Sequence, residues 1–219
     1  MPTQTDPGVW FYIDKGGVVM LIIIALSIIA FTIALAKFWS LWHFRAHLEK
    51  LGQRIQPQLI DGNVSIALNV CREYTSPVSR LFEAAILYRR QERSELTRRL
   101  ERLGGDVVAG LESYLGVLAA IIGVAPMLGF LGTIIGLIRA FRSWEAMGDQ
   151  ITINMLSGGI YEAMLTTAAG LSVTIPYYLI YSHLTTRAKN LTRLTEEHTE
   201  TLVDLLIEPE IQEPVRDAV

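Results

Sequence analysis

The sequence has little of what most soluble enzymes depend on. It contains one cysteine, Cys71, so the chain can form no internal disulfide and offers no cysteine-based metal site. Neither glycine-rich nucleotide loop, GxGxxG or GxxxxGK(S/T), is present, so an ATP-driven reaction lacks its usual loop. His43 and His47 stand four residues apart, but no carboxylate completes an evident metal site with them. No local arrangement of nucleophile and base occurs either, and we expect no enzyme activity, no cofactor and no bound metal.

Charged residues are almost absent from three long stretches. Residues 18–36, 115–138 and 159–182 hold most of the hydropathy of a 219-residue chain that is 51% apolar. About 20 residues at 1.5 Å rise cross a hydrocarbon core of roughly 30 Å. Residues 18–36 lack the basic start and the cleavage site of a signal peptide, so we expect this helix to be retained. The sequence therefore predicts an all-α membrane protein with three transmembrane helices in a lipid bilayer.

These stretches divide the chain into seven segments. The segments outside the three spans are mostly charged, and much of them has helical periodicity. We expect long helical extensions outside the bilayer. In chain order the segments are an interfacial N-terminus (1–15), a first span (16–38), a helical insert (39–113), a second span (114–138), a short loop (139–158), a third span (159–182) and a helix with a loose tail (183–219).

Lysine and arginine are distributed unevenly among these segments. Residues 37–113 contain twelve of the nineteen and residues 183–219 another four, whereas residues 1–15 contain one and residues 139–158 contain two. The positive-inside rule therefore places the insert and the C-terminal segment in the cytoplasm, with the N-terminus and the short loop in the periplasm. Neither this distribution nor the net charge of −3 points to nucleic acid, and we expect no such partner.

The insert carries clear helix and turn signals. Asp61-Gly62-Asn63 marks a turn, and Ser76 is a plausible N-cap with Pro77 at the first helical position. Six arginines between residues 89 and 102 alternate with glutamates, which indicates a solvated helix face; attraction to anionic lipid is the alternative. We expect this helix to continue into the second span, loosened at Gly104-Gly105. The third span should likewise continue as a helix that packs against the basic insert.

The second span is rich in small residues. Gly132 and Gly136 form a GxxxG pair, and Gly129 with Thr133 forms a second pair of small residues at the same spacing. Such pairs let helix backbones approach closely, so we expect an interior position for this span. Pro126 removes one backbone hydrogen bond and should bend the helix.

The third span has a polar stripe and one carboxylate. Ala163, Thr167, Gly170 and Thr174 recur at three- and four-residue spacing, which gives one face of small or hydroxyl-bearing side chains suited to meeting other helices. Pro176 should bend this span as Pro126 bends the second. The carboxylate is Glu162, one turn inside the helix start.

Glu162 and two threonines are the candidate functional residues. An acidic residue at membrane depth is a functional-site hypothesis because burying its charge is costly; the alternative for Glu162 is an interfacial residue that favours the helix N-terminus. Thr133 and Thr167 both lie roughly 10 Å below the outer surface, by residue count at 1.5 Å per residue. We expect them to form a shared polar layer, although each hydroxyl could instead bond to its own helix.

Two motifs resemble the MotA/TolQ/ExbB proton channel family. They are PMLGFLGTIIG at residues 126–136 and SGGIYEAMLTTAAGL at residues 157–171. The likeness extends to the three spans, the cytoplasmic insert and the cytoplasmic tail, so it covers nearly the whole chain. The pairs Gly158-Gly159 and Thr166-Thr167 are more similar to ExbB than to TolQ.

The resemblance implies a particular assembly. It implies a homopentamer whose second and third spans line a central pore, with a dimer of ExbD- or TolR-like single-span partners inside the pore. In the family, the titrating aspartate belongs to that partner, and a TonB- or TolA-like protein is a further candidate partner. The pore-lining threonines of the family match Thr133 and Thr167 here, and its glutamate matches Glu162.

The functional expectation is a stator subunit of an inner-membrane motor. Protons would cross between the pore-lining helices and the partner, and the motor would convert proton-motive force into work on the cell envelope, such as energising TonB-dependent import. Two alternatives stay open: a membrane scaffold without ion flux, and a sodium-driven homologue. A solute transporter is disfavoured, because three spans show neither an inverted repeat nor a broken-helix pair.

Overall fold

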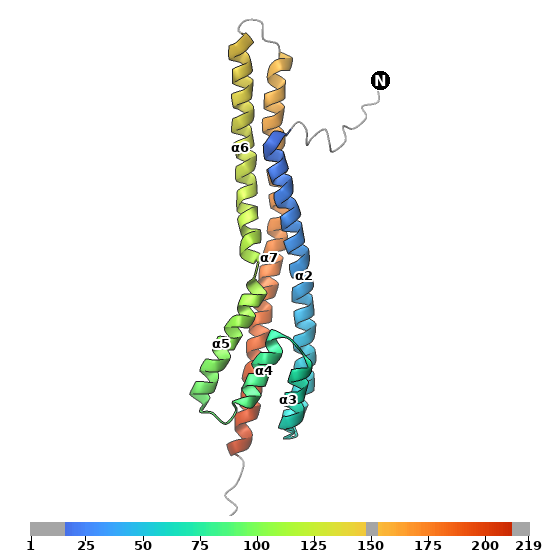
Figure 1. The fold of residues 1–219 in the computed structure, drawn as a ribbon, viewed down its shortest axis with the longest axis vertical. Coiled ribbons are helices and arrows are strands. Elements are labelled where there is room, and N and C mark those ends of the chain that lie inside the picture. The colour runs from blue at the N-terminus through green and yellow to red at the C-terminus, as the bar shows by residue number, and fades with distance from the viewer. Residues whose placement is uncertain (1–15, 148–152, 212–219) are drawn as a thin grey trace, which may run out of the picture. The chain divides into compact units, whose positions relative to one another are not determined.

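The computed structural model describes residues 16–147 and 153–211, and within these ranges it contains helices and no strand (Figure 1). The expected N-terminal segment 1–15, residues 148–152 of the expected loop and residues 212–219 of the expected tail lie outside the described residues. The helices are α2 (Gly17–Ile60), α3 (Val64–Glu73), α4 (Pro77–Leu87), α5 (Arg93–Glu112), α6 (Leu115–Met147) and α7 (Ile153–Ile211).

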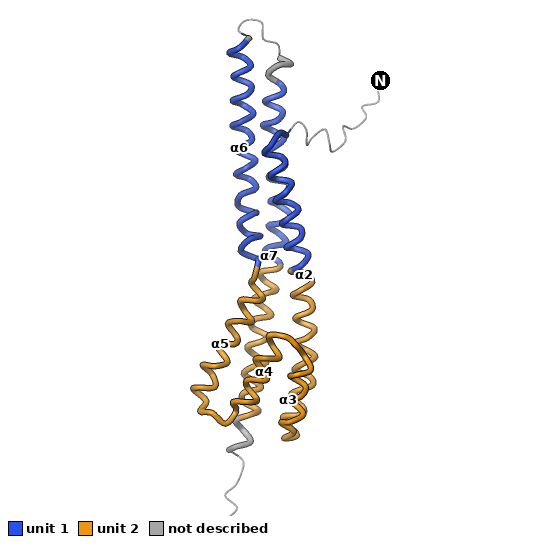
Figure 2. Tube along the Cα trace, in the orientation of Figure 1, with its two compact units in different colours: residues 1–36, 114–183 blue, residues 37–113, 184–219 orange. Residues whose placement is uncertain are grey.

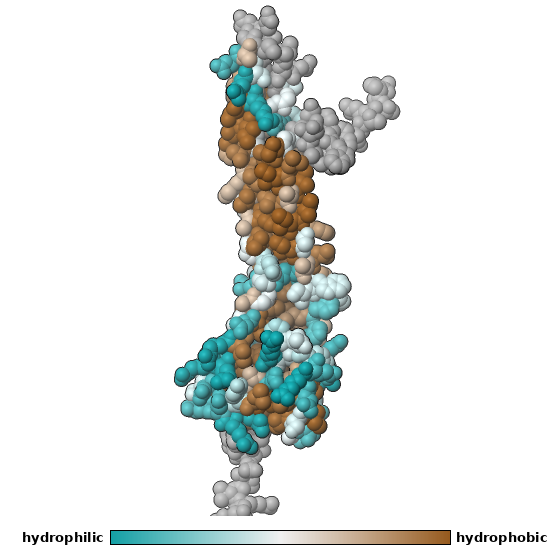
Figure 3. Space-filling view, in the orientation of Figure 1, coloured by the Kyte–Doolittle hydropathy of each residue, from teal (hydrophilic) through white to brown (hydrophobic). Residues whose placement is uncertain are grey.

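Three helical stretches are long and apolar enough to cross a membrane, as the sequence predicted. They lie within residues 17–60, 93–146 and 157–206. Apolar residues cover much of the surface of these stretches in the space-filling view (Figure 3). Met127 and Met164, for example, are 71% and 70% exposed. Monomeric soluble proteins rarely expose apolar patches of this extent, and such a surface suits contact with lipid.

The chain forms two compact units (Figure 2). The first contains residues 1–36 and 114–183, and the second contains residues 37–113 and 184–219. In the first unit α6 and the apolar parts of α2 and α7 pack together. The second unit contains α3, α4 and α5 with the remaining parts of α2 and α7.

Buried aliphatic side chains hold the second unit together. The turn and cap signals predicted from the sequence are confirmed here: Gly62 has a φ of 74° between α2 and α3, a backbone conformation that glycine adopts without strain. The Ser76 hydroxyl accepts a hydrogen bond from the Ser79 amide at 3.1 Å, with Pro77 at the start of α4. The largest fully buried side chains of this unit are Leu41, Leu48, Leu51, Ile55, Leu81, Phe82, Ile86, Leu96, Leu184 and Leu202.

The break between α5 and the second span lies at Ser113-Tyr114, so the expected loosening at Gly104-Gly105 was wrong. Both glycines lie inside α5. A glycine costs a helix only about 1 kcal/mol, and buried Leu100 and Val107 hold this helix on either side of the pair. Tyr114 has a φ of 62°, in the left-handed region that few residues other than glycine adopt, and this conformation ends the helical run.

Lys37 caps the C-terminal end of α5. Its ammonium group donates hydrogen bonds to the carbonyl oxygens of Gly110 at 3.0 Å and Leu111 at 3.2 Å, and to the Ser113 hydroxyl at 2.9 Å. The last carbonyls of a helix have no partner within the helix and carry partial negative charge, so a lysine is well suited to them. The side chain is buried, at 5% exposure.

The helix that follows the third span continues as predicted. α7 remains helical to Ile211, well beyond the apolar run. It reaches the basic insert within the second unit, where the Arg93 guanidinium donates to Asp204 at 3.2 Å. Both side chains are more than half exposed, so this contact adds little to stability.

Candidate functional site

In the first unit, α6 and α7 meet along a seam of small residues. A Cβ atom added to Gly136 would lie 2.5 Å from the Gly159 carbonyl oxygen, and one added to Gly170 would lie 2.7 Å from the Ala125 carbonyl oxygen. These backbones therefore touch directly, as glycine-lined membrane helices can. We call these residues the α6/α7 seam: Ala125, Gly129, Gly132, Gly136 and Ala140 from α6, and Gly159, Ala163, Thr166 and Gly170 from α7.

The seam explains most of the small residues that the sequence singled out. Their faces were expected to meet other helices, and in the structure they meet each other within one chain. Gly129, Gly132, Gly136 and Gly170 are all buried. Close packing of one chain therefore accounts for these four glycines, whereas Thr133 and Thr167 remain partly exposed.

Thr167 forms a hydrogen bond across the seam. Its hydroxyl lies 3.1 Å from the Gly129 carbonyl oxygen of α6 and 3.4 Å from the Ala163 carbonyl oxygen of its own helix. A hydroxyl has one proton, so it donates to one of these at a time and keeps its lone pairs for an incoming donor. Thr167 as a whole residue is partly exposed, so a group outside the chain can approach this side chain.

Thr133 bonds to its own helix. Its hydroxyl donates to the Phe130 carbonyl oxygen at 2.6 Å, which is the local alternative considered for this residue. No hydrogen bond joins the Thr133 and Thr167 side chains, both of which are described. The two residues are nevertheless linked through Gly129: α-helical geometry makes the Thr133 amide the donor to the same carbonyl that Thr167 approaches.

Thr166 is a buried hydroxyl that sequence reasoning did not single out. It is 0% exposed, and its oxygen lies 3.0 Å from the Ala163 carbonyl and 3.1 Å from the Glu162 carbonyl of its own helix. Gly132 faces it so closely that any Cβ there would overlap the Thr166 side chain. Thr166 is therefore enclosed by packing, whereas its neighbour Thr167 is partly exposed.

Thr174 of α7 makes a further contact with α6, at the Ile122 carbonyl that Pro126 leaves without a donor. Proline has no amide proton, so Pro126 leaves the Ile122 carbonyl of the preceding turn without its helical donor. The Thr174 hydroxyl of α7 lies 3.4 Å from that carbonyl oxygen. Thr174 thus supplies, at the long end of hydrogen-bond distance, the donor that Pro126 removed. Pro176, the other predicted kink residue, lies inside α7.

Glu162 forms an ion pair with Arg139. One guanidinium nitrogen of Arg139 donates to both carboxylate oxygens at 2.6 Å. The Glu162 side chain is 11% exposed and the Arg139 side chain is 55% exposed. An acidic group that is mostly buried needs such a partner, because isolated burial of its charge is costly. In the sequence, Arg139 is only the first residue of the expected short loop, and nothing there pairs it with Glu162.

Gly17 closes over this ion pair from a third helix. It begins α2 with a φ of 61°, and a Cβ there would lie 2.5 Å from a Glu162 carboxylate oxygen. Any larger residue would therefore be strained and would press on the carboxylate. One end of each of the three spans, from α2, α6 and α7, thus meets at Glu162. Nothing about the Gly16-Gly17 pair in the sequence indicated that Gly17 packs against Glu162.

The two histidines that resembled a metal pair are engaged with each other and with aromatic rings. The His43 ring stacks on Trp39 with 5.3 Å between ring centroids, and the His47 ring nitrogen Nδ1 lies 2.8 Å from the His43 carbonyl oxygen. Across the described ranges, no three side chains of histidine, cysteine, aspartate or glutamate gather in a way that could hold a metal ion.

Comparison with known proteins shows what the chain is similar to. Residues 73–197 match the MotA/TolQ/ExbB proton channel family. An ExbB homolog of Methanothermobacter thermautotrophicus, named as a biopolymer transport protein, is 34% identical over 181 residues, which cover 79% of this chain and 61% of that relative. The chain therefore spans less than two thirds of that relative's length.

Two further relatives extend this similarity. The biopolymer transport protein ExbB of Neisseria meningitidis is 27% identical over 189 residues, covering 80% of this chain and 84% of the relative. The Tol-Pal system protein TolQ of Haemophilus influenzae is 35% identical over 80 residues, covering 36% of this chain and 35% of the relative. Together with the three apolar helical stretches, these similarities support a multi-pass protein of the inner membrane.

Proposed function

Because the chain belongs to the MotA/TolQ/ExbB proton channel family, we propose that it is a stator-type subunit of a proton channel in an energising complex. The complex would be an inner-membrane motor of the ExbB–ExbD or TolQ–TolR kind. It would convert proton-motive force into mechanical work on the cell envelope, for example to energise TonB-dependent import. Each charge that crosses 100 mV supplies about 2.3 kcal/mol, so several protons deliver useful work without a nucleotide.

The proposed assembly is a homopentamer around a dimer of single-span, ExbD- or TolR-like partners. α6 and α7 of each copy would line the central pore, and a TonB- or TolA-like protein would relay the work. The N-terminus would lie in the periplasm and the second unit in the cytoplasm. The lysine and arginine distribution supports this orientation, and the motif resemblance supports the partner class.

The observation that carries the pathway is the hydrogen bond that partly exposed Thr167 makes across the α6/α7 seam. Its hydroxyl lies 3.1 Å from the Gly129 carbonyl oxygen, and an oxygen that donates its one proton can still accept a hydrogen bond. A protonated carboxyl group of the partner, or a water next to it, could donate to this oxygen. Thr133, partly exposed and one helical turn from Gly129, would line the same path. The carboxyl group that titrates would come from the partner.

Glu162 would act at the entrance of this path and not as the proton carrier. A carrier must be free to exchange hydrogen bonds along the path, whereas both Glu162 oxygens are engaged at 2.6 Å by one Arg139 nitrogen. The pair would instead fix the ends of α6 and α7 beside the start of α2 and set the charge at the mouth of the channel.

A membrane scaffold without ion flux is the second candidate. It is favoured by the α6/α7 seam, since packing within one chain already explains the regular spacing of small residues along both helices. A sodium-driven motor is a third, because threonine hydroxyls can serve either ion.

Vesicles separate these functions. The chain would be co-purified with its single-span partner, reconstituted, and given a membrane potential while internal pH is recorded. Proton uptake that requires the partner supports the proposal. Partner-dependent entry of sodium without proton uptake, recorded with a sodium-sensitive dye, supports the sodium-driven alternative. Absence of any ion flux from correctly assembled complexes supports the scaffold.

A further inference from the structure

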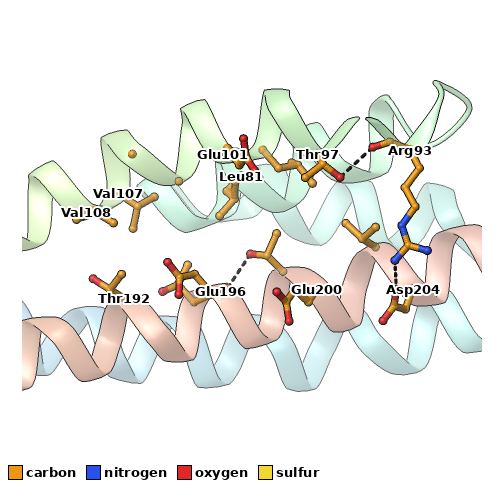
Figure 4. Close-up of a pocket in the computed structure, with 16 residues that line it drawn as sticks. Leu81, Arg93, Thr97, Glu101, Val107, Val108, Thr192, Glu196, Glu200 and Asp204 are labelled. Carbon is orange, nitrogen blue, oxygen red and sulfur yellow. Dashed lines mark hydrogen bonds and ion pairs between the residues drawn. The ribbon is translucent and has the colours of Figure 1, made fainter. Parts of the chain in front are cut away.

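The second unit contains an open groove of about 780 Å³ between α5 and α7 (Figure 4). Its floor is apolar, with Leu81, Leu100 and Val107 among the lining residues. Gly104 and Gly105 contribute no side chain, and a Cβ atom added to either would meet nothing within 4 Å. The groove is therefore wide enough to admit side chains from another molecule. Gly104 and Gly105 leave its α5 side open because they have no side chains.

Carboxylates line this acidic groove. Glu101 stands on α5, and Glu196 and Glu200 stand on α7. None of these three forms an ion pair with a described residue. Asp204 is the fourth carboxylate of the groove, and it bonds to Arg93, the one basic residue of the lining, at 3.2 Å. The acidic groove thus holds three carboxylates whose charge nothing in the described part of the chain balances.

A smaller groove of about 520 Å³ lies between α4 and α5, and its charge is opposite. Arg80, Arg99 and Arg102 line it, and its one carboxylate, Glu83, is already paired with Arg72 at 2.8 Å. We call this the basic groove. Leu87, which is 48% exposed, adds an apolar surface to its rim.

Arg99 is stacked on an aromatic ring at the basic groove. Its guanidinium stacks on the Tyr88 ring at 3.9 Å from the ring centroid, which fixes the side chain in place. Its Nε atom is buried and has no hydrogen-bond partner. The basic groove therefore presents a positioned guanidinium that lacks a carboxylate.

The two grooves lie on different sides of α5. Thr97, Glu101 and Gly104 recur at four- and three-residue spacing and face the acidic groove. Arg99 and Arg102 are offset from them around the helix and face the basic groove. Each copy of the chain therefore carries a carboxylate-lined groove and an arginine-lined groove on opposite sides of α5.

From this complementarity we infer that the acidic groove of one copy receives the basic-groove rim of a second copy. The contact is head-to-tail, because the two surfaces differ and each copy uses both. Contacts of this kind close into rings when the rotation between copies allows it. The inference rests on the assembly part of the proposed function, and it does not depend on proton conduction.

Charge reversal tests the inference on the complex with its partner. The first variant, Glu196→Arg with Glu200→Arg, makes the acidic groove basic; the second, Arg80→Glu with Arg102→Glu, makes the basic groove acidic. We expect each variant alone to lose most of the assembled form in native mass spectrometry. Combining all four substitutions in one chain should restore the original mass, because complementarity returns in the opposite sense.

A control and a contrary outcome define this test. Asp106→Arg reverses an exposed charge on α5 that lines neither groove, and it should leave the mass unchanged. Failure of the fourfold variant to recover, while it retains helical content, would overturn the inference. So would an unchanged mass of the Arg80→Glu, Arg102→Glu variant together with lost binding to vesicles containing phosphatidylglycerol, since the arginines would then serve a lipid surface.

Cross-linking gives a second test that does not depend on stability. Cys71 is the sole native cysteine and is buried, so introduced cysteines can be addressed selectively. A chain with Glu196→Cys and Arg102→Cys should give covalent dimers and larger species with a flexible bis-maleimide. Glu196→Cys with Lys50→Cys is the control pair, and it should give none. Equal ladders from both pairs would refute the head-to-tail contact.

These readouts separate the inference from the function. A complex whose mass falls when the charge of either groove is reversed, but which carries no protons, would support the contact between copies. The same result would contradict the proposed proton-channel function.

Discussion

Arg139 and Glu162 join α6 to α7 through one guanidinium nitrogen that lies 2.6 Å from both carboxylate oxygens. The two partners differ in their surroundings: the carboxylate is 11% exposed and the arginine side chain is 55% exposed. Loss of one partner therefore has a different consequence from loss of the other. The asymmetry makes the role of the pair measurable.

Arg139→Gln should destabilise the protein more than Glu162→Gln. The first change leaves a mostly buried carboxylate without a counter-charge, at a cost of roughly 1–3 kcal/mol after allowance for the exposed partner. The second leaves an arginine that water can solvate. Thermal unfolding of the detergent-solubilised complex measures both. The double variant should be more stable than Arg139→Gln alone, and additive losses would contradict the pairing.

Gly136→Ala should weaken the α6/α7 seam. A methyl group there would come within 2.5 Å of the Gly159 carbonyl oxygen, and relief of the clash should cost about 1–3 kcal/mol. Gly123→Ala is the matched control on the same helix, because a Cβ at that position meets nothing within 4 Å. Comparison of the two unfolding temperatures tests the seam. Equal stability of the two variants would mean that α6 and α7 are not in close contact there.

Lys37→Met should loosen the end of α5. It removes three hydrogen bonds and leaves the Leu111 carbonyl without its side-chain donor, while the Gly110 carbonyl keeps only the Ser113 hydroxyl at 2.9 Å; the loss should cost about 1–3 kcal/mol. Hydrogen exchange of the amides in residues 106–113 should become faster. Lys50→Met, which removes an exposed lysine of the same helix, should leave that exchange unchanged. Unaltered exchange in the Lys37 variant would exclude the capping role.

Cys71 should be unreactive in the folded protein. Burial raises the pKa of its thiol to about 12, with a smaller contribution from the Glu83 charge, and only the thiolate reacts with alkylating reagents. At pH 8, iodoacetamide should label Cys71 only after denaturation, as mass spectrometry can measure.

Burial of the Cys71 thiol should also make the stability of the folded protein depend on pH. The unfolded thiol ionises near pH 9 and the folded thiol does not, so the unfolded state binds fewer protons between about pH 9 and 12. Stability should therefore fall with rising pH in this window, and it should fall less in Cys71→Ala. Parallel stability curves for the two proteins would contradict the shifted pKa.

Much of the fold follows from local patterns in the sequence. Apolar runs of sufficient length predicted the three candidate spans, and the Ser76-Pro77 cap was predicted because its hydrogen bonds connect neighbouring residues. The break at Tyr114 was missed because an unusual φ at a tyrosine leaves no mark in composition. The glycine pair expected to break α5 is instead held within the helix by buried neighbours.

The candidate site was only partly predictable. Glu162 and Thr167 were singled out from their chemistry and spacing, but their partners Arg139 and Gly129 come from another helix. Thr166 and Thr167 are adjacent and alike in sequence, and tertiary packing alone determines which is buried. Periodicity identifies a face of a helix but does not say what covers that face.

Proton uptake by vesicles with Thr167 variants tests the central claim most directly. Thr167→Val keeps the shape and removes the hydroxyl, Thr167→Ser keeps the hydroxyl, and Thr32→Val removes an exposed hydroxyl that bonds only within α2. With the partner present, we predict uptake at background level for Thr167→Val and clear uptake for the other two, at equal assembly. Wild-type uptake by Thr167→Val would contradict the proposed pathway.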